Sequence, residues 1–199
     1  MIEIKSFLND VPYLRFKTIY EKALDLKEAN IEAICISSYN ESIREVNSRF
    51  VNLKYIDGDK WTFFSNYNSL KAKEFKSNQN IAAVFFWKNI NTQIRIKGKI
   101  LKSSKGISDE HYNSRSKEKN ALAYISNQSE TINSYEMVIS KYEDALKNKD
   151  KFDKRPNYWG GYTFTPYYFE FWEGHKSRLN KRDAYVLNGC NWKHSFLQP

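Results

Sequence analysis

Positively charged side chains and hydroxyl groups gather in one stretch of the chain, residues 48–76. The stretch reads as a strand, a tight turn at Asp57-Gly58, a second strand, a polar loop and the start of a helix. Cations at strand ends and near a helix N-terminus suit a phosphate, because they form charge-assisted hydrogen bonds with its oxygens. The polar candidates are Arg49, Lys54, Ser65, Asn66, Ser69 and Lys71. The pattern also fits a soluble hairpin followed by a solvated, lysine-rich helix, and taken alone it favours that plainer interpretation.

No other motif indicates a familiar catalytic site. The sequence has no Gly-rich phosphate loop, GxGxxG, HExxH or GxSxG, which argues against a Rossmann dinucleotide site and a serine hydrolase. His111, His175 and His194 have no Cys or His partner at metal-ligand spacing, so no metal is predicted. Glu170 lies among aromatic residues and could be an acid with a raised pKa, but pairing with a nearby Arg is the favoured interpretation.

The composition narrows the class of protein. The chain has 199 residues, which fits one domain over 1–199, and a formal charge of +9 with a pI near 9.3. The cations are scattered, so nucleic acid is a minor hypothesis. No run approaches the ~20 apolar residues of a membrane helix, and the first residues do not resemble a signal peptide. Cys35, expected to be a buried thiol, and Cys190 form no disulfide framework, so we expect a cytoplasmic protein that binds no membrane.

The N-terminal region, residues 1–30, is predicted to contain a helix. Asp10 is a suitable cap with Pro12 in the first turn, and apolar residues then recur at helical spacing. A short strand over residues 31–37 and a turn over residues 38–42 are expected before the hairpin.

Two further strands are predicted in the middle of the chain. Residues 81–87, IAAVFFW, are all apolar, so we expect a central strand that is buried on both faces. Residues 93–101 alternate between apolar and polar side chains, which is typical of a strand with one exposed face. Gly98 interrupts this alternation and predicts a bulge or bend.

The second half of the chain turns helical and then returns to strands. A helical insertion is expected over residues 105–150, and the charged run over residues 147–155 is expected to be a solvated loop. The C-terminal strands are expected within 159–199, over residues 162–172, 184–187 and 192–197. Many strands with a few helices favour a mainly β, α+β fold, a β-barrel with flanking helices.

Several separated blocks resemble the pyridoxine/pyridoxamine 5′-phosphate oxidase family. They are SRFVNLK (48–54), FFSNYNSLKA (63–72), NQSETI (127–132) and WGGYTFTPYYFEFWEGHKSRLNKR (159–182), with FWKNINTQIRIKG (86–98) between them and FLQP at the C-terminus. The resemblance covers the chain from Pro12 onward. It implies a split β-barrel that binds FMN at the interface of a homodimer, where a cleft between two subunits encloses the flat flavin ring.

The resemblance also implies a set of FMN-binding residues. They are Arg49, Phe50, Val51, Asn52, Leu53, Lys54, Phe64, Ser65, Lys71, Gln93, Gln128, Ser129, Trp172 and Arg182. Leu70 stands where the family has an Arg. The absence of that Arg removes a charge-assisted contact of about 1.5–3 kcal/mol. Lys73 is a candidate substitute. Phe64 and Ser65 stand for a Tyr-Thr pair, so a phenol is lost and a hydroxyl is kept.

The substrate residues implied by the resemblance differ more from the family. They are Lys54, His111, Arg115, Lys119, Arg178 and Asn180. His111 replaces a Tyr, Lys119 a Ser and Asn180 a His, so any acid–base role of that His is lost. Arg178 is the candidate catalytic residue, because it is expected to position the substrate.

The implied activity is an FMN-dependent oxidation of pyridoxamine or pyridoxine 5′-phosphate. A hydride passes from the substrate to flavin N5, and O2 is the final acceptor. Two alternatives remain open at this point. One is a related flavin oxidase with another substrate, of the phenazine-pathway type, and the other is a non-catalytic protein that binds flavin or pyridoxal phosphate.

Overall fold

The computed structural model describes residues 1–147 and 152–199. The described strands are β1 (Glu3–Ser6), β2 (Ala33–Asn40), β3 (Glu45–Asp57), β4 (Lys60–Asn66), β5 (Asn80–Trp87), β6 (Thr92–Lys102), β7 (Trp159–Glu173), β8 (Lys181–Asn188) and β9 (Asn191–Phe196). The described helices are α1 (Val11–Asp25), α2 (Leu70–Ser77), the 3-10 turn η1 (Lys88–Ile90), α3 (Lys105–Ser114), α4 (Lys117–Ile125) and α5 (Tyr135–Leu146).

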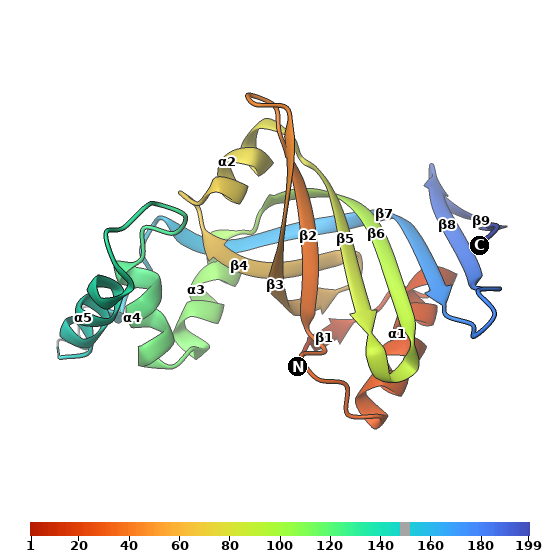
Figure 1. Ribbon diagram of the computed structural model, residues 1–199, viewed down its shortest axis with the longest axis horizontal. Coiled ribbons are helices and arrows are strands. Elements are labelled where there is room, and N and C mark those ends of the chain that lie inside the picture. The colour runs from red at the N-terminus through yellow and green to blue at the C-terminus, as the bar shows by residue number, and fades with distance from the viewer. Residues whose placement is uncertain (148–151) are drawn as a thin grey trace.

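The strands form one sheet that closes into a barrel. β4 pairs with β3 on one side and with β7 on the other, so that the order β3-β2-β5-β6-β7-β4 returns to β3. The long strand β7 pairs first with β4 and then, along the same edge, with β8. β8 and β9 therefore extend beyond the barrel, and Figure 1 shows them at the opposite end of the molecule from α4 and α5. This is the predicted split β-barrel with flanking helices.

Glycines allow close approach at two points of the barrel. The pairing of β6 with β7 shifts register between Lys97 and Gly98, which confirms the predicted bulge. A Cβ at Gly98 would lie 2.9 Å from the carbonyl oxygen of Thr165. At the start of β7, a Cβ on Gly160 would collide with the hydroxyl of Tyr67 and crowd Ser108 Oγ, so a larger residue would force these side chains to move.

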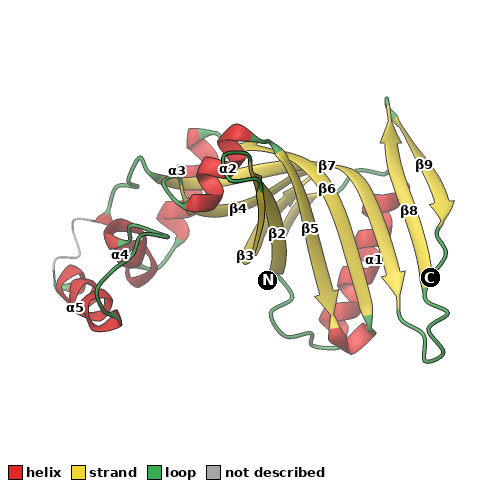
Figure 2. Cartoon of the chain, turned by 45° about the horizontal axis from the view of Figure 1, so that its top comes forward, coloured by secondary structure: helices red, strands yellow, loops and turns green. Residues whose placement is uncertain are grey.

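Aromatic side chains from the barrel and from α1 share one core. Phe16 of α1 contacts Trp61 of β4 with ring centroids 4.5 Å apart, and Tyr13 contacts Phe169 of β7 edge-on at 5.3 Å. Large rings bury much apolar area, so this packing fixes α1 against the barrel. Figure 2 shows the helix lying beside the strands. The N-terminal helix is thereby confirmed, and β1, which pairs in parallel with β3, is an additional strand that the sequence pattern did not reveal.

The prediction that β5 is buried on both faces is wrong. Ile81, Phe85 and Trp87 point into the core, whereas Phe86 is 57% exposed. The sheet here is antiparallel and covered on one side, so apolar residues on the other side lie at the surface of the single chain. Cys35 of the neighbouring strand β2 is likewise half-buried, not a core thiol.

Two loop predictions also need correction. β2 continues through Asn40, so the turn falls at residues 41–44 and β3 is longer than expected. In the charged run 147–155, residues 148–151 lie outside the described residues. The end of the run is only partly solvated: Asp153 and Lys154 are exposed, whereas Phe152 is buried and Arg155 Nε donates to Asp109 Oδ1 at 2.6 Å. Among the described residues, no helix has both the length and the apolar character to cross a membrane.

Candidate functional site

A cavity of about 850 Å³ lies between β3, β4, the N-terminus of α2 and the helices α3 and α4. None of the described residues that line it is an Asp or Glu. Its lining includes thirteen of the predicted site residues: Arg49, Phe50, Val51, Asn52, Lys54, Phe64, Ser65, Lys71, His111, Arg115, Lys119, Gln128 and Ser129. Five of these are cationic, so the cavity favours an anionic ligand.

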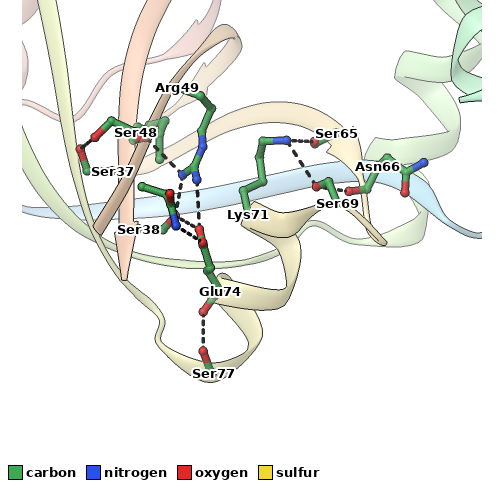
Figure 3. Close-up of polar contacts among 12 residues, drawn as sticks. Ser37, Ser38, Ser48, Arg49, Ser65, Asn66, Ser69, Lys71, Glu74 and Ser77 are labelled. Atoms are coloured by element: carbon green, nitrogen blue, oxygen red, sulfur yellow. Dashed lines mark hydrogen bonds and ion pairs between the residues drawn. The ribbon is translucent and has the colours of Figure 1, made fainter. Parts of the chain in front are cut away.

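Lys71 is the buried cation of this cavity. It follows Ser69 at the start of α2 and is only 6% exposed. Its Nζ donates to Ser65 Oγ and Ser69 Oγ, each at 3.3 Å, as Figure 3 shows, and no carboxylate among the described residues pairs with it. Burial, followed by the positive charge of Arg49, lowers the pKa of Lys71 to about 8. A bound anion would offset both effects, so Lys71 is suited to hold a phosphate.

Arg49, by contrast, is already paired inside the protein. Its Nη2 lies 3.0 Å from Glu74 Oε2, and its Nη1 donates to Ser38 Oγ at 2.5 Å (Figure 3). Glu74 is 2% exposed and also accepts from Asn47 Nδ2 at 2.7 Å. The charge of Arg49 is therefore compensated, and its guanidinium is held at the cavity wall.

An aromatic stack forms a second wall of the cavity. The ring of His111 lies on Phe64 with centroids 3.7 Å apart and planes at 13°, and Phe64 in turn stacks near Trp159 at 5.5 Å. Tyr55 Oη lies 2.7 Å from His111 Nδ1. Burial, followed by the charges of nearby cations, lowers the pKa of His111 to about 4, so the ring is neutral at pH 7.

Three cations face the same part of the cavity as His111. Arg115 lies over the Trp159 ring at 4.3 Å, and its Nη2 donates to the Lys119 carbonyl oxygen at 2.9 Å. Its Nη1 is buried without a hydrogen-bond partner among the described residues, and burial lowers its pKa. The other two cations are Lys54 and Lys119. Lys54 is paired inside the protein, since its Nζ lies 2.7 Å from Glu32 Oε1. Arg115 and Lys119 have no such carboxylate partner in the part of the chain that the structure describes.

Gln128 and Ser129 reach the cavity from the segment between α4 and α5. Gln128 Oε1 accepts from Ser65 Oγ at 3.1 Å and from the Asn66 backbone N–H at 3.3 Å. Ser129 has a φ of 76°, which is the left-handed region. Gln128 therefore fastens this segment to the end of β4, beside Lys71.

The remaining predicted residues lie elsewhere in the chain. Gln93, Trp172 and Arg182 occupy one row across β6, β7 and β8, where each pairs with the next. Arg178 and Asn180 belong to the loop between β7 and β8, and none of these five residues lines the cavity. Figures 1 and 2 show β8 far from α3 and α4, so one chain does not bring the two predicted groups together.

Contacts within this second group are mostly internal. Arg182 Nε and Nη2 each lie 2.8 Å from Glu170 Oε1, and Arg95 Nη1 lies 2.8 Å from Glu170 Oε2. Glu170 is thus paired with arginines, as the favoured interpretation predicted. Asn180 Oδ1 accepts from the His175 backbone N–H at 3.0 Å and shapes the loop.

Two of the residues considered for the cofactor place their side chains outside this cavity. Leu53 is fully buried in the barrel core, because strand alternation turns it inward between Asn52 and Lys54. Lys73, the candidate substitute for the missing Arg at position 70, lines a separate cavity behind α2. The described residues also hold no cluster of three His, Cys, Asp or Glu side chains arranged for a metal ion.

Sequence reasoning missed three residues that shape the cavity. Glu74 holds Arg49, Tyr55 holds His111, and Trp159 supports both Phe64 and Arg115. Helical spacing could have found Glu74, because it lies one turn after Lys71 on the buried face of α2. No comparable signal distinguishes Tyr55 and Trp159 from other aromatic strand residues.

Two sequence families match this chain. Residues 24–148 match the family described as pyridoxamine 5′-phosphate oxidase, and residues 159–199 match the pyridoxine 5′-phosphate oxidase C-terminal dimerisation region. Pyridoxine/pyridoxamine 5′-phosphate oxidase 1 of Hydrogenovibrio crunogenus is 34% identical over 98% of this chain and 91% of its own length. The corresponding oxidase of Cytophaga hutchinsonii is 37% identical over 89% of this chain and 83% of its own length.

Solved structures support the fold. PhzG from Burkholderia lata, crystallised with tetrahydrophenazine-1-carboxylic acid, matches with a TM-score of 0.88 at 23% identity, over 94% of this chain and 92% of its own. A pyridoxamine 5′-phosphate oxidase-related, FMN binding protein from Nostoc punctiforme matches with a TM-score of 0.75 at 13% identity, over 92% and 97%. The sequence matches and the split barrel agree. The chain therefore belongs to the pyridoxine/pyridoxamine 5′-phosphate oxidase family of FMN-dependent oxidoreductases.

Proposed function

We propose that the chain is an FMN-dependent oxidase of pyridoxamine or pyridoxine 5′-phosphate that works as a homodimer. The observation that carries the proposal is the cationic cavity around Lys71, which has no Asp or Glu among its described lining residues. A volume of about 850 Å³ is within the usual size of a cofactor site. Family membership supports the activity, and the cavity supports the cofactor.

The cavity's donors fit the phosphate of FMN. Lys71 is a buried ammonium that makes only two long hydrogen bonds, both to serine hydroxyls. A phosphate beside it would supply the anion that its surroundings lack, and Ser65 and Arg49 line the same part of the cavity. Side-chain cations thus take the place of a Gly-rich loop, although Leu70 supplies none.

Arg115, Lys119 and His111 suit a second anion, which we assign to the substrate phosphate. Nη1 of Arg115 is a buried donor without a partner among the described residues, and a phosphate oxygen would satisfy it. The planar stack of His111 on Phe64 would lie beside the substrate's ring. These residues bind and orient the substrate, whereas the chemistry that FMN supplies when bound is two-electron oxidation with O2 as the final acceptor.

A homodimer would complete the site. The cavity and the Gln93–Trp172–Arg182 row lie in different parts of one chain, so two chains are needed to oppose them. Phe86 pairs with Gln93 and is exposed on the same outward face of the sheet, and Phe50, two strands away, is 73% exposed. Phe86 and Phe50 thus form an exposed apolar patch beside the row, which a second copy of the chain could cover. The match to a dimerisation region over residues 159–199 supports this arrangement.

The visible spectrum of the purified protein tests the proposal. We expect a yellow protein whose flavin absorption bleaches when pyridoxamine 5′-phosphate is added without oxygen and returns when air is admitted. A yellow protein that does not bleach would mean another substrate or a non-catalytic flavin binder. A colourless protein that also does not bind added FMN would contradict both the proposed activity and the proposed cofactor.

A further inference from the structure

His111 is held in one orientation by two neighbouring rings. Tyr55 Oη lies 2.7 Å from its Nδ1 and approaches edge-on, with an interplanar angle of 89°. Phe64 covers one face of the imidazole at 3.7 Å. A side chain fixed at one nitrogen and one face cannot turn to bring Nδ1 to a ligand without losing both contacts.

The free nitrogen of His111 is the one left for the cavity. Nε2 makes no hydrogen bond with any described residue, and His111 lines the cavity whereas Tyr55 does not. Burial raises the pKa of Tyr55, so its phenol stays protonated and can donate to Nδ1. In the tautomer that accepts this hydrogen bond at Nδ1, the imidazole hydrogen is on Nε2, where it can be donated to a ligand.

The charges around His111 oppose its protonation in the absence of an anion. Arg115, Lys54 and Lys119 face it from β3 and from the helical segment, and with burial they keep it neutral. The remaining charged neighbours lie beyond Tyr55, where Lys5 sits over the phenol ring and pairs with Glu110, and Glu3 adds a negative charge. Lys54 is already paired with Glu32, so a dianionic phosphate would offset the charges of Arg115 and Lys119 and remove their opposition to protonation.

We propose that His111 is a specificity-determining residue that donates from Nε2 to the dianionic phosphate of the substrate and takes up one proton as that phosphate binds. The proton comes from solvent and is added at Nδ1, and the Tyr55 hydroxyl turns to accept it. His111 thereby adds a positive charge to the site only when a phosphate is present. The inference rests on the proposed function, because it takes the substrate to be a phosphate monoester.

Isothermal titration calorimetry of the FMN-loaded protein with pyridoxal 5′-phosphate tests this inference. Titrations at pH 6 in two phosphate-free buffers of different ionisation enthalpy count the protons taken up. If the pKa of His111 returns to its ordinary value in the complex, wild type takes up about three quarters of a proton more than His111→Tyr. The Tyr variant keeps a stacked ring and a hydroxyl donor but cannot accept the proton. The same linkage tightens wild-type binding about fourfold, relative to His111→Tyr, between pH 8 and pH 6.

Each outcome decides between the claims. Equal proton uptake by wild type and His111→Tyr would overturn the role of His111 and leave the oxidase proposal intact. No binding of pyridoxal 5′-phosphate to any variant that retains FMN would overturn the proposed substrate class, and the inference with it. If His111→Tyr does not fold, Tyr55→Phe gives the second test. That variant is expected to take up less proton than wild type, and an unchanged uptake would overturn the proposal.

Discussion

Arg49 and Glu74 form an ion pair of 3.0 Å in the wall of the cavity, although they come from a strand and a helix 25 residues apart. The pair compensates a cation that the sequence alone assigns to the cofactor. Lys71, one turn before Glu74 on α2, has no such partner among the described residues. The pair therefore leaves Lys71 as the buried cation with the most to gain from a bound phosphate.

Glu74→Gln should destabilise the protein. The amide keeps the shape of the side chain but leaves Arg49 without an anionic partner and weakens the hydrogen bonds from Ser38 and Asn47. We expect the free energy of unfolding to fall by about 1–3 kcal/mol in urea denaturation. Lys76→Gln, an exposed change on the same helix, should alter it by less than about 0.5 kcal/mol. Equal stability of Glu74→Gln and wild type would mean that the pair is not formed in solution.

Leu70→Arg should tighten FMN binding. Leu70 lines the cavity next to Lys71 and is 41% exposed, so a guanidinium there can reach the same anion without displacing core residues. One added charge-assisted hydrogen bond should lower the Kd for FMN roughly tenfold. Quenching of FMN fluorescence on titration measures this Kd. Lys73→Ala is the control, because Lys73 lines the other cavity and should leave the Kd unchanged. An unaltered or weaker affinity of Leu70→Arg would place the phosphate away from α2.

The affinity for FMN should fall as the pH rises through the pKa of Lys71. Burial, then the charge of Arg49, lowers this pKa to about 8, whereas the ordinary value is 10.5. Phosphate binds the ammonium form, so above pH 8 binding requires proton uptake, and the Kd should rise about tenfold between pH 7 and pH 9. The stability of the unliganded protein should change in the opposite direction. Between pH 8 and pH 10.5 the unfolded chain holds more protons at Lys71 than the folded chain does, so the free energy of unfolding should rise with pH. Lys71→Met should show a flat profile for the Kd over the same range, and a matching slope in that variant would assign the titration to another group.

Two variants that we expect to be inactive alone should restore activity together if each site is built from both copies of the chain. Lys71→Met damages the cavity, and Arg182→Ala damages the row on β6, β7 and β8. In a heterodimer of the two, one site carries both defects and the other carries none. Co-expressed in equal amounts, they should recover about a quarter of wild-type oxidase activity, since half of the dimers are mixed and each has one intact site. Failure to recover activity in a verified heterodimer would place both residues in the same chain's site.

Much of the fold could be predicted from local patterns in the sequence. The bulge at Gly98 and the helix after Asp10 follow from residue types that act within a few positions. The exposure of Phe86 could not be predicted from the sequence. The same apolar run fits a strand covered on both faces within one chain and a strand whose outer face is open in the single chain. Only the arrangement of the whole sheet distinguishes the two.

The candidate site was predicted in composition but not in its internal pairing. The resemblance to the family supplied the residues of the cavity, including Lys71 and Gln128. It did not reveal that Glu74 engages Arg49 or that Tyr55 engages His111, because those contacts join segments far apart in the sequence. Side-chain pairing of this kind depends on tertiary distances that no local periodicity encodes.

Comparison of FMN with riboflavin tests the central claim most directly, since the two differ by the phosphate. If Lys71 holds that phosphate, titration of the flavin-free protein should give a Kd for FMN at least about tenfold below that for riboflavin, and Lys71→Met should remove most of this preference. Equal affinities of the wild-type protein for FMN and riboflavin would contradict the account.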